Sequence, residues 1–150
     1  MNKAKKPLPP TYFQIYLVAE VILHFLVPIA EIIQAPYTYL GIPLIVFGIV
    51  LNIWADSLFK TNKTTVKPFE GSCVLISEGP FRFSRHPMYL GFVSILLGLA
   101  ILLGSLVAFL TPIAMFLTLE TMFIPHEERN LGEVFGEKYE GYRKRVRRWL

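Results

Sequence analysis

The chain has 150 residues, 53% of them hydrophobic and only 17% charged, and its formal net charge is +4. Soluble domains carry about 25% charged residues, so this composition is typical of a membrane protein and argues against an ordinary soluble domain. The single cysteine, Cys73, excludes an intramolecular disulfide and any metal site built from several cysteines. Because the sequence shows no internal repeat and no low-complexity tract, we expect one domain over residues 1–150.

Two apolar segments in the first half of the chain predict two transmembrane helices, at residues 12–30 and 39–59. Each has about the 20 residues that a helix needs to cross a bilayer. The first contains Glu20 and His24, which at this spacing can satisfy each other or line a cavity. A signal peptide is the alternative for this segment. It is longer than a typical apolar region of about 7–15 residues and is interrupted by ionisable groups, so we interpret it as a retained span.

A long apolar run later in the chain predicts a helical hairpin. Pro87–Leu119 contains 33 residues without Asp, Glu, Lys, Arg or His. At about 1.5 Å per residue, one helix of this length would exceed a bilayer core of about 30 Å. We therefore expect two antiparallel spans, 88–103 and 106–124, that turn near Gly104 and Ser105. The predicted fold class is an all-α polytopic membrane protein with four transmembrane helices.

The basic residues predict the orientation of these spans. All 15 Lys and Arg precede the first span, separate the second from the third, or follow the fourth. The three groups are Lys3, Lys5 and Lys6; Lys60, Lys63, Lys67, Arg82 and Arg85; and Arg129, Lys138, Arg143, Lys144, Arg145, Arg147 and Arg148. Because positive residues stay on the cytoplasmic side, we expect both termini, the loop 60–87 and the tail 125–150 to be cytoplasmic. Orientation thus explains the excess of base without a nucleic-acid partner.

The end of the tail predicts a cytoplasmic amphipathic helix. Tyr139, Tyr142, Val146 and Trp149 follow one another at helical spacing. Such a helix lies in the membrane interface, where anionic lipid holds its basic face. We expect Trp149 to anchor it and the helix to cover the neighbouring site as a lid.

The predicted hairpin brings two polar clusters together at the cytoplasmic face, because its two helices are antiparallel neighbours. Arg85 and His86 directly precede Pro87, and a proline at a helix start leaves free N–H groups that favour an anion. The fourth helix ends in the acidic pair Glu127 and Glu128. Such residues often only pair with one another at a helix end. A ligand with a carboxylate, an ammonium and a sulfonium, such as S-adenosylmethionine, would also suit them, since aromatic faces attract a sulfonium.

The motif GPFRFSRHPMYLG, followed by the hairpin and by EERNLGEVFGEKYEGYRKRVRRWL, resembles the isoprenylcysteine carboxyl methyltransferase and phospholipid methyltransferase superfamily of integral membrane enzymes. The signature of that superfamily is Arg-His-Pro-x-Tyr, a hydrophobic hairpin and then Glu-Glu. The resemblance covers about Asn52–Leu150. It implies methyl transfer from S-adenosylmethionine to a lipophilic acceptor at the cytoplasmic membrane face, with an amine, a carboxylate or a thiol as the accepting group. No metal is needed for this reaction.

The resemblance also implies site residues. The expected cofactor contacts are Val74, Leu75, Ile76, Phe81, His86, Pro87, Met88, Tyr89 and Glu127. We assign the catalytic roles to Arg85, which would orient a carboxylate or phosphate, and to Glu128, which would balance positive groups. The weaker predictions for acceptor contacts are Glu20, His24, Asp56, Glu120 and Phe123. Isoprenylcysteine enzymes usually have an arginine at the position of Phe123, so we do not carry over their substrate.

Two other functions stay open from the sequence. A membrane reductase of the sterol-reductase type, using NADPH, shares the short Arg-His-Pro-x-Tyr turn. In a non-enzymatic membrane scaffold, the polar clusters would only fix the topology. The sequence identifies neither the methyl acceptor nor the oligomeric state.

Overall fold

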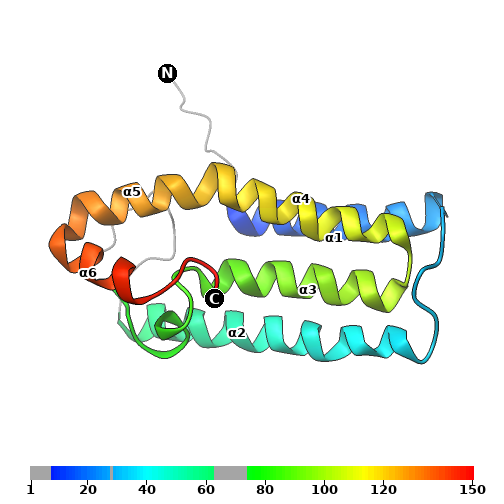
Figure 1. Ribbon diagram of the computed structural model, residues 1–150, viewed down its shortest axis with the longest axis horizontal. Coiled ribbons are helices and arrows are strands. Elements are labelled where there is room, and N and C mark those ends of the chain that lie inside the picture. Colours follow the sequence, from blue (N-terminus) through cyan, green and yellow to red (C-terminus); the bar gives the residue numbers. More distant parts are fainter. Residues whose placement is uncertain (1–7, 28, 63–73) are drawn as a thin grey trace, which may run out of the picture.

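The computed structural model describes residues 8–27, 29–62 and 74–150, and these residues form helices and turns without a named β-strand (Figure 1). The helical elements are α1 (Pro9–Leu26), η1 (Tyr37–Leu40), α2 (Gly41–Thr61), η2 (Gly79–Arg82), α3 (Pro87–Leu103), η3 (Leu106–Phe109), α4 (Leu110–Thr118), η4 (Leu119–Phe123), α5 (Ile124–Phe135) and α6 (Glu137–Arg145). The predicted all-α class is confirmed. Cys73 and the basic residues Lys3, Lys5, Lys6, Lys63 and Lys67 lie outside the described residues.

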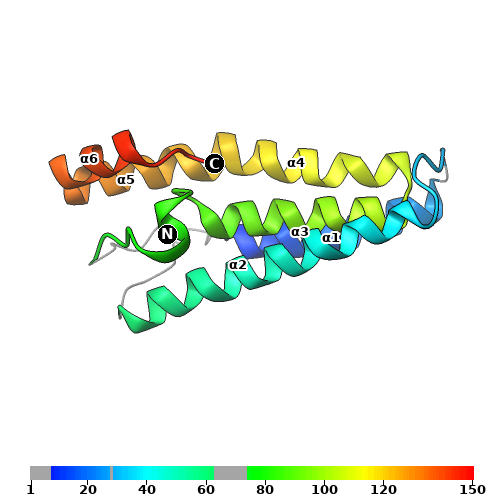
Figure 2. The same cartoon turned by 60° about the horizontal axis from the view of Figure 1, so that its bottom comes forward.

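Helix α3 is the central rod of the molecule. It contacts α1, α2 and α4. Figure 1 shows α2 on one side of it and α1 and α4 on the other, and Figure 2 shows α3 between α4 and α2. On its buried face, Phe92 and Leu96 pack against Met115 of α4 and Leu119 of η4. Because α3 is held on several sides, the residues at its start have fixed positions relative to the other helices.

Four glycines let α2 and α3 approach closely. Gly41 lies against Gly98, and Gly48 lies against Gly91, so each helix contributes two glycines seven residues apart. A Cβ atom added to Gly98 would lie 2.6 Å from the carbonyl oxygen of Gly41, and one added to Gly48 would lie 2.5 Å from that of Gly91. Small residues at a helix interface allow the backbones to touch, which is the usual way for helices to associate in a membrane.

The turn of the hairpin lies where the sequence predicts it. Helix α3 ends at Leu103, and Gly104 adopts a left-handed φ of 68°, which a residue with a side chain would rarely accept. The backbone N–H of Ile32 donates to the carbonyl of Gly104 (2.8 Å), and that of Leu106 donates to Ala30 (2.9 Å). The connection between α1 and α2 therefore holds the hairpin turn in place.

The helix that follows this turn is longer than predicted. Residues Leu106–Phe135 form one continuous rod through η3, α4, η4 and α5, whereas we expected it to end at residue 124, just before Pro125. Proline removes one hydrogen bond and crowds the preceding turn. The segment η4, directly before Pro125, is a π-helix, and its wider turn accommodates the proline without breaking the rod.

Two of the rods are long and apolar enough to cross a membrane, Tyr37–Thr61 and Leu106–Phe135. Helix α3 is apolar but shorter, at 17 residues. Large apolar side chains point outwards on several rods: Ile15, Val18, Ile22 and Phe25 on α1, Val46, Ile49, Val50 and Ile53 on α2, and Leu110, Ile113 and Leu117 on α4. An exposed apolar surface of this extent suits contact with lipid.

The predicted amphipathic helix through Trp149 is wrong in its extent. Helix α6 ends at Arg145, and Val146 is extended, with φ −119° and ψ 130°. Residues 146–150, here called the return segment, lead back toward the start of α3 (Figure 1). The ring of Trp149 packs on Phe116, with 4.8 Å between the ring centroids. Trp149 is thus partly buried against the helices of the core and does not extend the face of α6.

Candidate functional site

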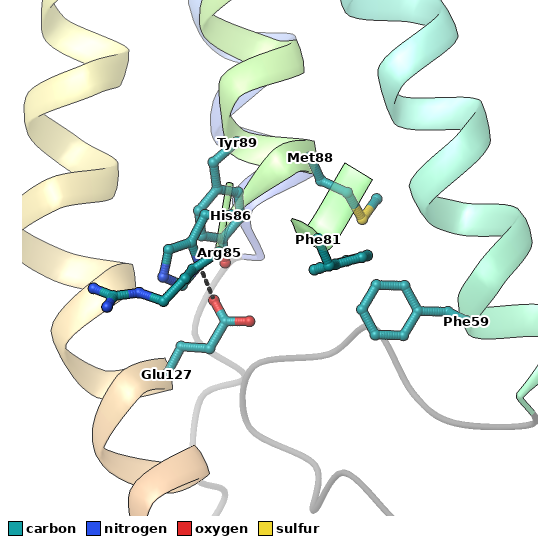
Figure 3. A pocket seen from close by; sticks show the side chains of 7 residues that line it. All are labelled: Phe59, Phe81, Arg85, His86, Met88, Tyr89 and Glu127. Carbon is teal, nitrogen blue, oxygen red and sulfur yellow. Dashed lines mark ion pairs between the residues drawn. The ribbon is translucent and has the colours of Figure 1, made fainter. Parts of the chain in front are cut away.

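A pocket opens between the start of α3 and the side of α5. The residues that line it come from α2, η2, α3, α5 and the link before α3: Phe59, Phe81, Arg85, His86, Met88, Tyr89 and Glu127 (Figure 3). Six of these seven were predicted from the sequence, and the structure brings them together. The seventh, Phe59 in the last turn of α2, was not predicted. Its ring meets Phe81 edge to face, with 5.5 Å between the ring centroids.

The local sequence fixes the start of α3. Pro87 is the first residue of the helix, where its missing N–H removes no hydrogen bond. The preceding His86 N–H donates to the Ser84 hydroxyl (3.2 Å). Because Tyr89 follows three residues later, its ring stacks on the imidazole of His86, with 5.5 Å between centroids and an interplanar angle of 4°. The aromatic wall of the pocket is therefore preformed.

The acidic pair on α5 straddles the imidazole ring. An oxygen of Glu127 lies 3.5 Å from Nδ1 of His86, and an oxygen of Glu128 lies 3.4 Å from Nε2 (Figure 3 draws the first contact). The Glu127 oxygen in the first contact is Oε2, which is buried and makes a long ion-pair contact with His86 rather than a well-formed hydrogen bond within the described part of the chain. The hydroxyl of Tyr89 faces the same carboxylate. Glu127 is therefore placed to receive a cationic group of a ligand.

Glu128 is already engaged by arginines. It accepts hydrogen bonds from Arg85 (2.6 Å) and from two nitrogens of Arg148 (3.1 and 2.8 Å). Its side chain is 10% exposed, compared with 25% for Glu127. The two adjacent carboxylates thus differ in their environment: Glu128 is held in ion pairs with arginines of the protein, whereas Glu127 lines the pocket.

Arg85 joins the start of α3 to the end of the chain that the structure describes. Its guanidinium donates to Glu128 and to the carbonyls of Arg143 (3.2 Å) and Val146 (3.4 Å). Its backbone N–H donates to the carbonyl of Arg147 (3.0 Å). The predicted role of Arg85 in orienting an anionic group stays a prediction, and most of its hydrogen-bonding capacity is used within the protein.

The predicted cofactor contacts before η2 lie apart from this pocket. Val74 and Leu75 line a second cavity of about 880 Å³, together with Ser77, Phe135, Lys138, Tyr142 and Arg145. Ile76 is buried in a cluster with Ala55 and Phe81. The hydroxyl of Tyr142 donates to the carbonyl of Phe81 (2.8 Å), so these two residues form the wall between the two cavities.

The predicted acceptor residues on the long helix Leu106–Phe135 are occupied by contacts within the protein. Glu120 pairs with Arg148 and accepts a hydrogen bond from Nε1 of Trp149 (2.9 Å). Phe123 is buried, and its ring meets Tyr12 at 5.4 Å. A regular α-helix would place Glu120 on the same face as Glu127, two turns later, but Arg148 joins Glu120 to Glu128 instead. Two turns of an α-helix take about seven residues, and the π-helical turn adds one. The residue on the same face as Glu120 is therefore Glu128, eight positions later, and not Glu127.

The remaining predicted acceptor residues are dispersed. Asp56 pairs with Lys60 at 2.5 Å, near the end of α2. Glu20 is 0% exposed and faces Thr111, whose hydroxyl donates to a backbone carbonyl. A hydrogen bond between Glu20 and His24, one of the two alternatives that the sequence leaves open, is absent: neither carboxylate oxygen, nor Nδ1 of His24, has a hydrogen-bond partner among the described residues. Instead, the His24 ring meets Phe25.

The imidazole of His86 gives the site a predicted pH dependence. Burial alone lowers the pKa of His86, but the carboxylates of Glu127 and Glu128 outweigh it and raise the pKa above its ordinary value of 6.5. A raised folded-state pKa stabilises the protein fully below pH 6.5, and this stabilisation is lost as pH rises through the folded-state value. We expect His86→Gln to lower the melting temperature more at pH 6 than at pH 9. Thermal unfolding in detergent measures this, and a difference independent of pH would contradict it.

Comparison with known proteins connects this site to a family. The family model described as phospholipid methyltransferase matches residues 36–138. Two curated proteins described as probable protein-S-isoprenylcysteine O-methyltransferase, from Oryza sativa subsp. indica and subsp. japonica, are each 31% identical over 111 residues. The match covers 73% of this chain and 58% of each relative, so the chain spans little more than half their length.

A solved structure shares the fold. The eukaryotic intramembrane Ras methyltransferase ICMT (isoprenylcysteine carboxyl methyltransferase) matches with a TM-score of 0.64 and 21% sequence identity. The match covers 100% of this chain and 53% of that one. The likeness establishes a common helical architecture over the length of the chain.

Proposed function

The chain belongs to the phospholipid methyltransferase family, and we propose that it transfers a methyl group from S-adenosylmethionine to a lipophilic acceptor. The observation that carries this proposal is the pocket between α3 and α5. There, aromatic rings and the carboxylate of Glu127, which pairs with His86 at 3.5 Å, lie beside the first turn of a helix. Membership of this family favours methyl transfer over the reductase and scaffold functions that the sequence alone leaves open.

The residues present fit the cofactor. Glu127 lines the pocket and pairs with His86 through a long contact of 3.5 Å, so its carboxylate suits the ammonium group. The rings of Phe59, Phe81 and Tyr89 suit the sulfonium, because cations are attracted to aromatic faces. The first turn of α3 offers backbone N–H groups to the carboxylate. Among the described residues no group of side chains could hold a metal ion, and the proposal requires none.

The residues of the chain contribute positioning. When bound, S-adenosylmethionine supplies a methyl group activated by the positive sulfur. The aromatic wall and Glu127 would hold that group in one orientation and exclude water from it. Alignment of two reactants can contribute about 7–11 kcal/mol to a reaction of this kind. Because the rings of His86 and Tyr89 already stack on each other, binding a ligand would cost little additional side-chain entropy.

We further propose an integral membrane protein with four spans and with the pocket at the cytoplasmic face. The apolar outer surface of α1, α2 and α4 supports insertion in lipid. The concentration of Arg and Lys at the end where α5 and α6 lie supports the orientation. The acceptor would enter from lipid, with an amine, a carboxylate or a thiol as the accepting group.

Transfer of labelled methyl groups tests this function. Membranes containing the protein are incubated with S-adenosylmethionine labelled in its methyl group, and lipid-soluble products are extracted. We expect label in the extract above that from membranes containing Glu127→Gln. Release of the label as methanol in alkali would identify a carboxylate acceptor, and stable label an amine or a thiol. Equal labelling by the two membranes would contradict the proposal.

A further inference from the structure

The return segment, residues 146–150, is fastened to the start of α3 through its backbone. The carbonyl of Arg147 accepts from the N–H of Arg85 (3.0 Å), and the carbonyl of Arg148 accepts from the hydroxyl of Ser84 (3.2 Å). The guanidinium of Arg85 adds a bond to the carbonyl of Val146. These contacts join residues about 60 positions apart, and they fix where the side chain of Arg148 begins.

The side chain of Arg148 binds two carboxylates on the long helix Leu106–Phe135. Its Nε and one terminal nitrogen bind the two oxygens of Glu128, at 3.1 and 2.8 Å. Its other terminal nitrogen binds Glu120. A guanidinium suits this task because its planar fork can donate to two carboxylates at once, which an ammonium cannot do with the same geometry. Trp149 holds Glu120 from the other side.

The π-helical segment η4 makes this double contact possible. It includes Glu120 and ends before Glu127, and its extra residue places Glu120 above Glu128. Glu127 is turned away from Arg148 and toward the pocket. Thus the same local irregularity of the helix assigns the two neighbouring carboxylates to different partners.

We propose that Arg148 is a positioning residue of the site, and that it reserves Glu127 for the ligand by neutralising Glu128. The inference rests on the proposed function. Without Arg148, Glu128 would keep Arg85 and His86 as its ion-pair partners among the described residues. Its carboxylate would then draw the imidazole of His86 and the cationic group of the ligand away from Glu127. The return segment is in this way a working part of the site, although no residue from it lines the pocket.

Calorimetric titration of the full chain with S-adenosylhomocysteine tests the inference. We expect Arg148→Gln to weaken binding at least tenfold and Arg148→Lys to weaken it less, because lysine keeps the charge but loses the fork. Arg147→Gln is the matched control, since the Arg147 side chain is exposed, and we expect it to bind within about twofold of the unmodified protein.

A second variant separates positioning from simple structural support. In Arg148→Gln combined with Glu128→Gln, the competing charge is absent, so we expect affinity closer to the unmodified protein than in Arg148→Gln alone. Unchanged affinity in both Arg148→Gln and Arg148→Lys, or equal loss in the single and double variants, would overturn the inference. Absence of binding by the unmodified protein would instead overturn the proposed function.

Discussion

Replacement of Glu127 with glutamine is expected to weaken the binding of S-adenosylhomocysteine strongly while the protein stays folded. Glu127 lines the pocket, and its carboxylate pairs with the imidazole of His86 at 3.5 Å. Loss of one partner of a buried charged hydrogen bond weakens binding by about 2–4 kcal/mol, or roughly 30- to 700-fold. Calorimetric titration of the detergent-solubilised variant measures this change.

Glu133→Gln is the matched control for this variant. It makes the same chemical change on the same helix, α5, and Glu133 is exposed. We expect its affinity for S-adenosylhomocysteine to be unchanged. The account of the site fails if Glu127→Gln binds as tightly as Glu133→Gln in preparations that are both monodisperse.

The second large effect is expected from Gly98→Ala, through the fold rather than the site. A Cβ atom at this position would lie 2.6 Å from the carbonyl oxygen of Gly41 and 2.9 Å from the backbone N of Ile45. Since both are backbone atoms of α2, the clash can be relieved only if α2 and α3 move apart. Overpacking of this kind destabilises by about 1–3 kcal/mol or more. We expect the melting temperature in detergent to fall by about 5–10 °C.

Gly132→Ala and Gly141→Ala are the controls, because they have room for a methyl group. The nearest atom to a Cβ at Gly132 lies 3.9 Å away, and nothing lies within 4 Å at Gly141. Alanine is the better helix former by about 1 kcal/mol, so these variants should be neutral or stabilised. A melting temperature of Gly98→Ala equal to that of the controls would show that the two helices do not depend on this contact.

The features that could be predicted from the sequence are those encoded by local signals. The apolar run from Pro87 and the Gly104-Ser105 pair within it predicted the hairpin and its turn. The hairpin in turn predicted that His86 would meet Glu127, and the structure places them together. Antiparallel helices joined by a short turn leave little freedom in which ends are neighbours.

The features that were missed depend on contacts between distant residues, or on a local change of helix geometry that accommodates a proline. A proline at position 125 usually ends a helix, and no local pattern indicated that a π-helical turn would accommodate it. The bonds of Arg148 to Glu120 and Glu128 follow from the path of the return segment, which has no periodic signature. The glycines of α2 and α3 did carry a signal, since a spacing of seven residues places small residues on one helix face.

The central claim is that the pocket between α3 and α5 binds the adenosyl cofactor of a methyltransferase. Calorimetric titration of the purified full chain with S-adenosylhomocysteine, and separately with NADPH, tests it most directly. The account predicts a dissociation constant on the order of micromolar for S-adenosylhomocysteine and no binding of NADPH. Binding of NADPH alone, or of neither compound by folded protein, would contradict it.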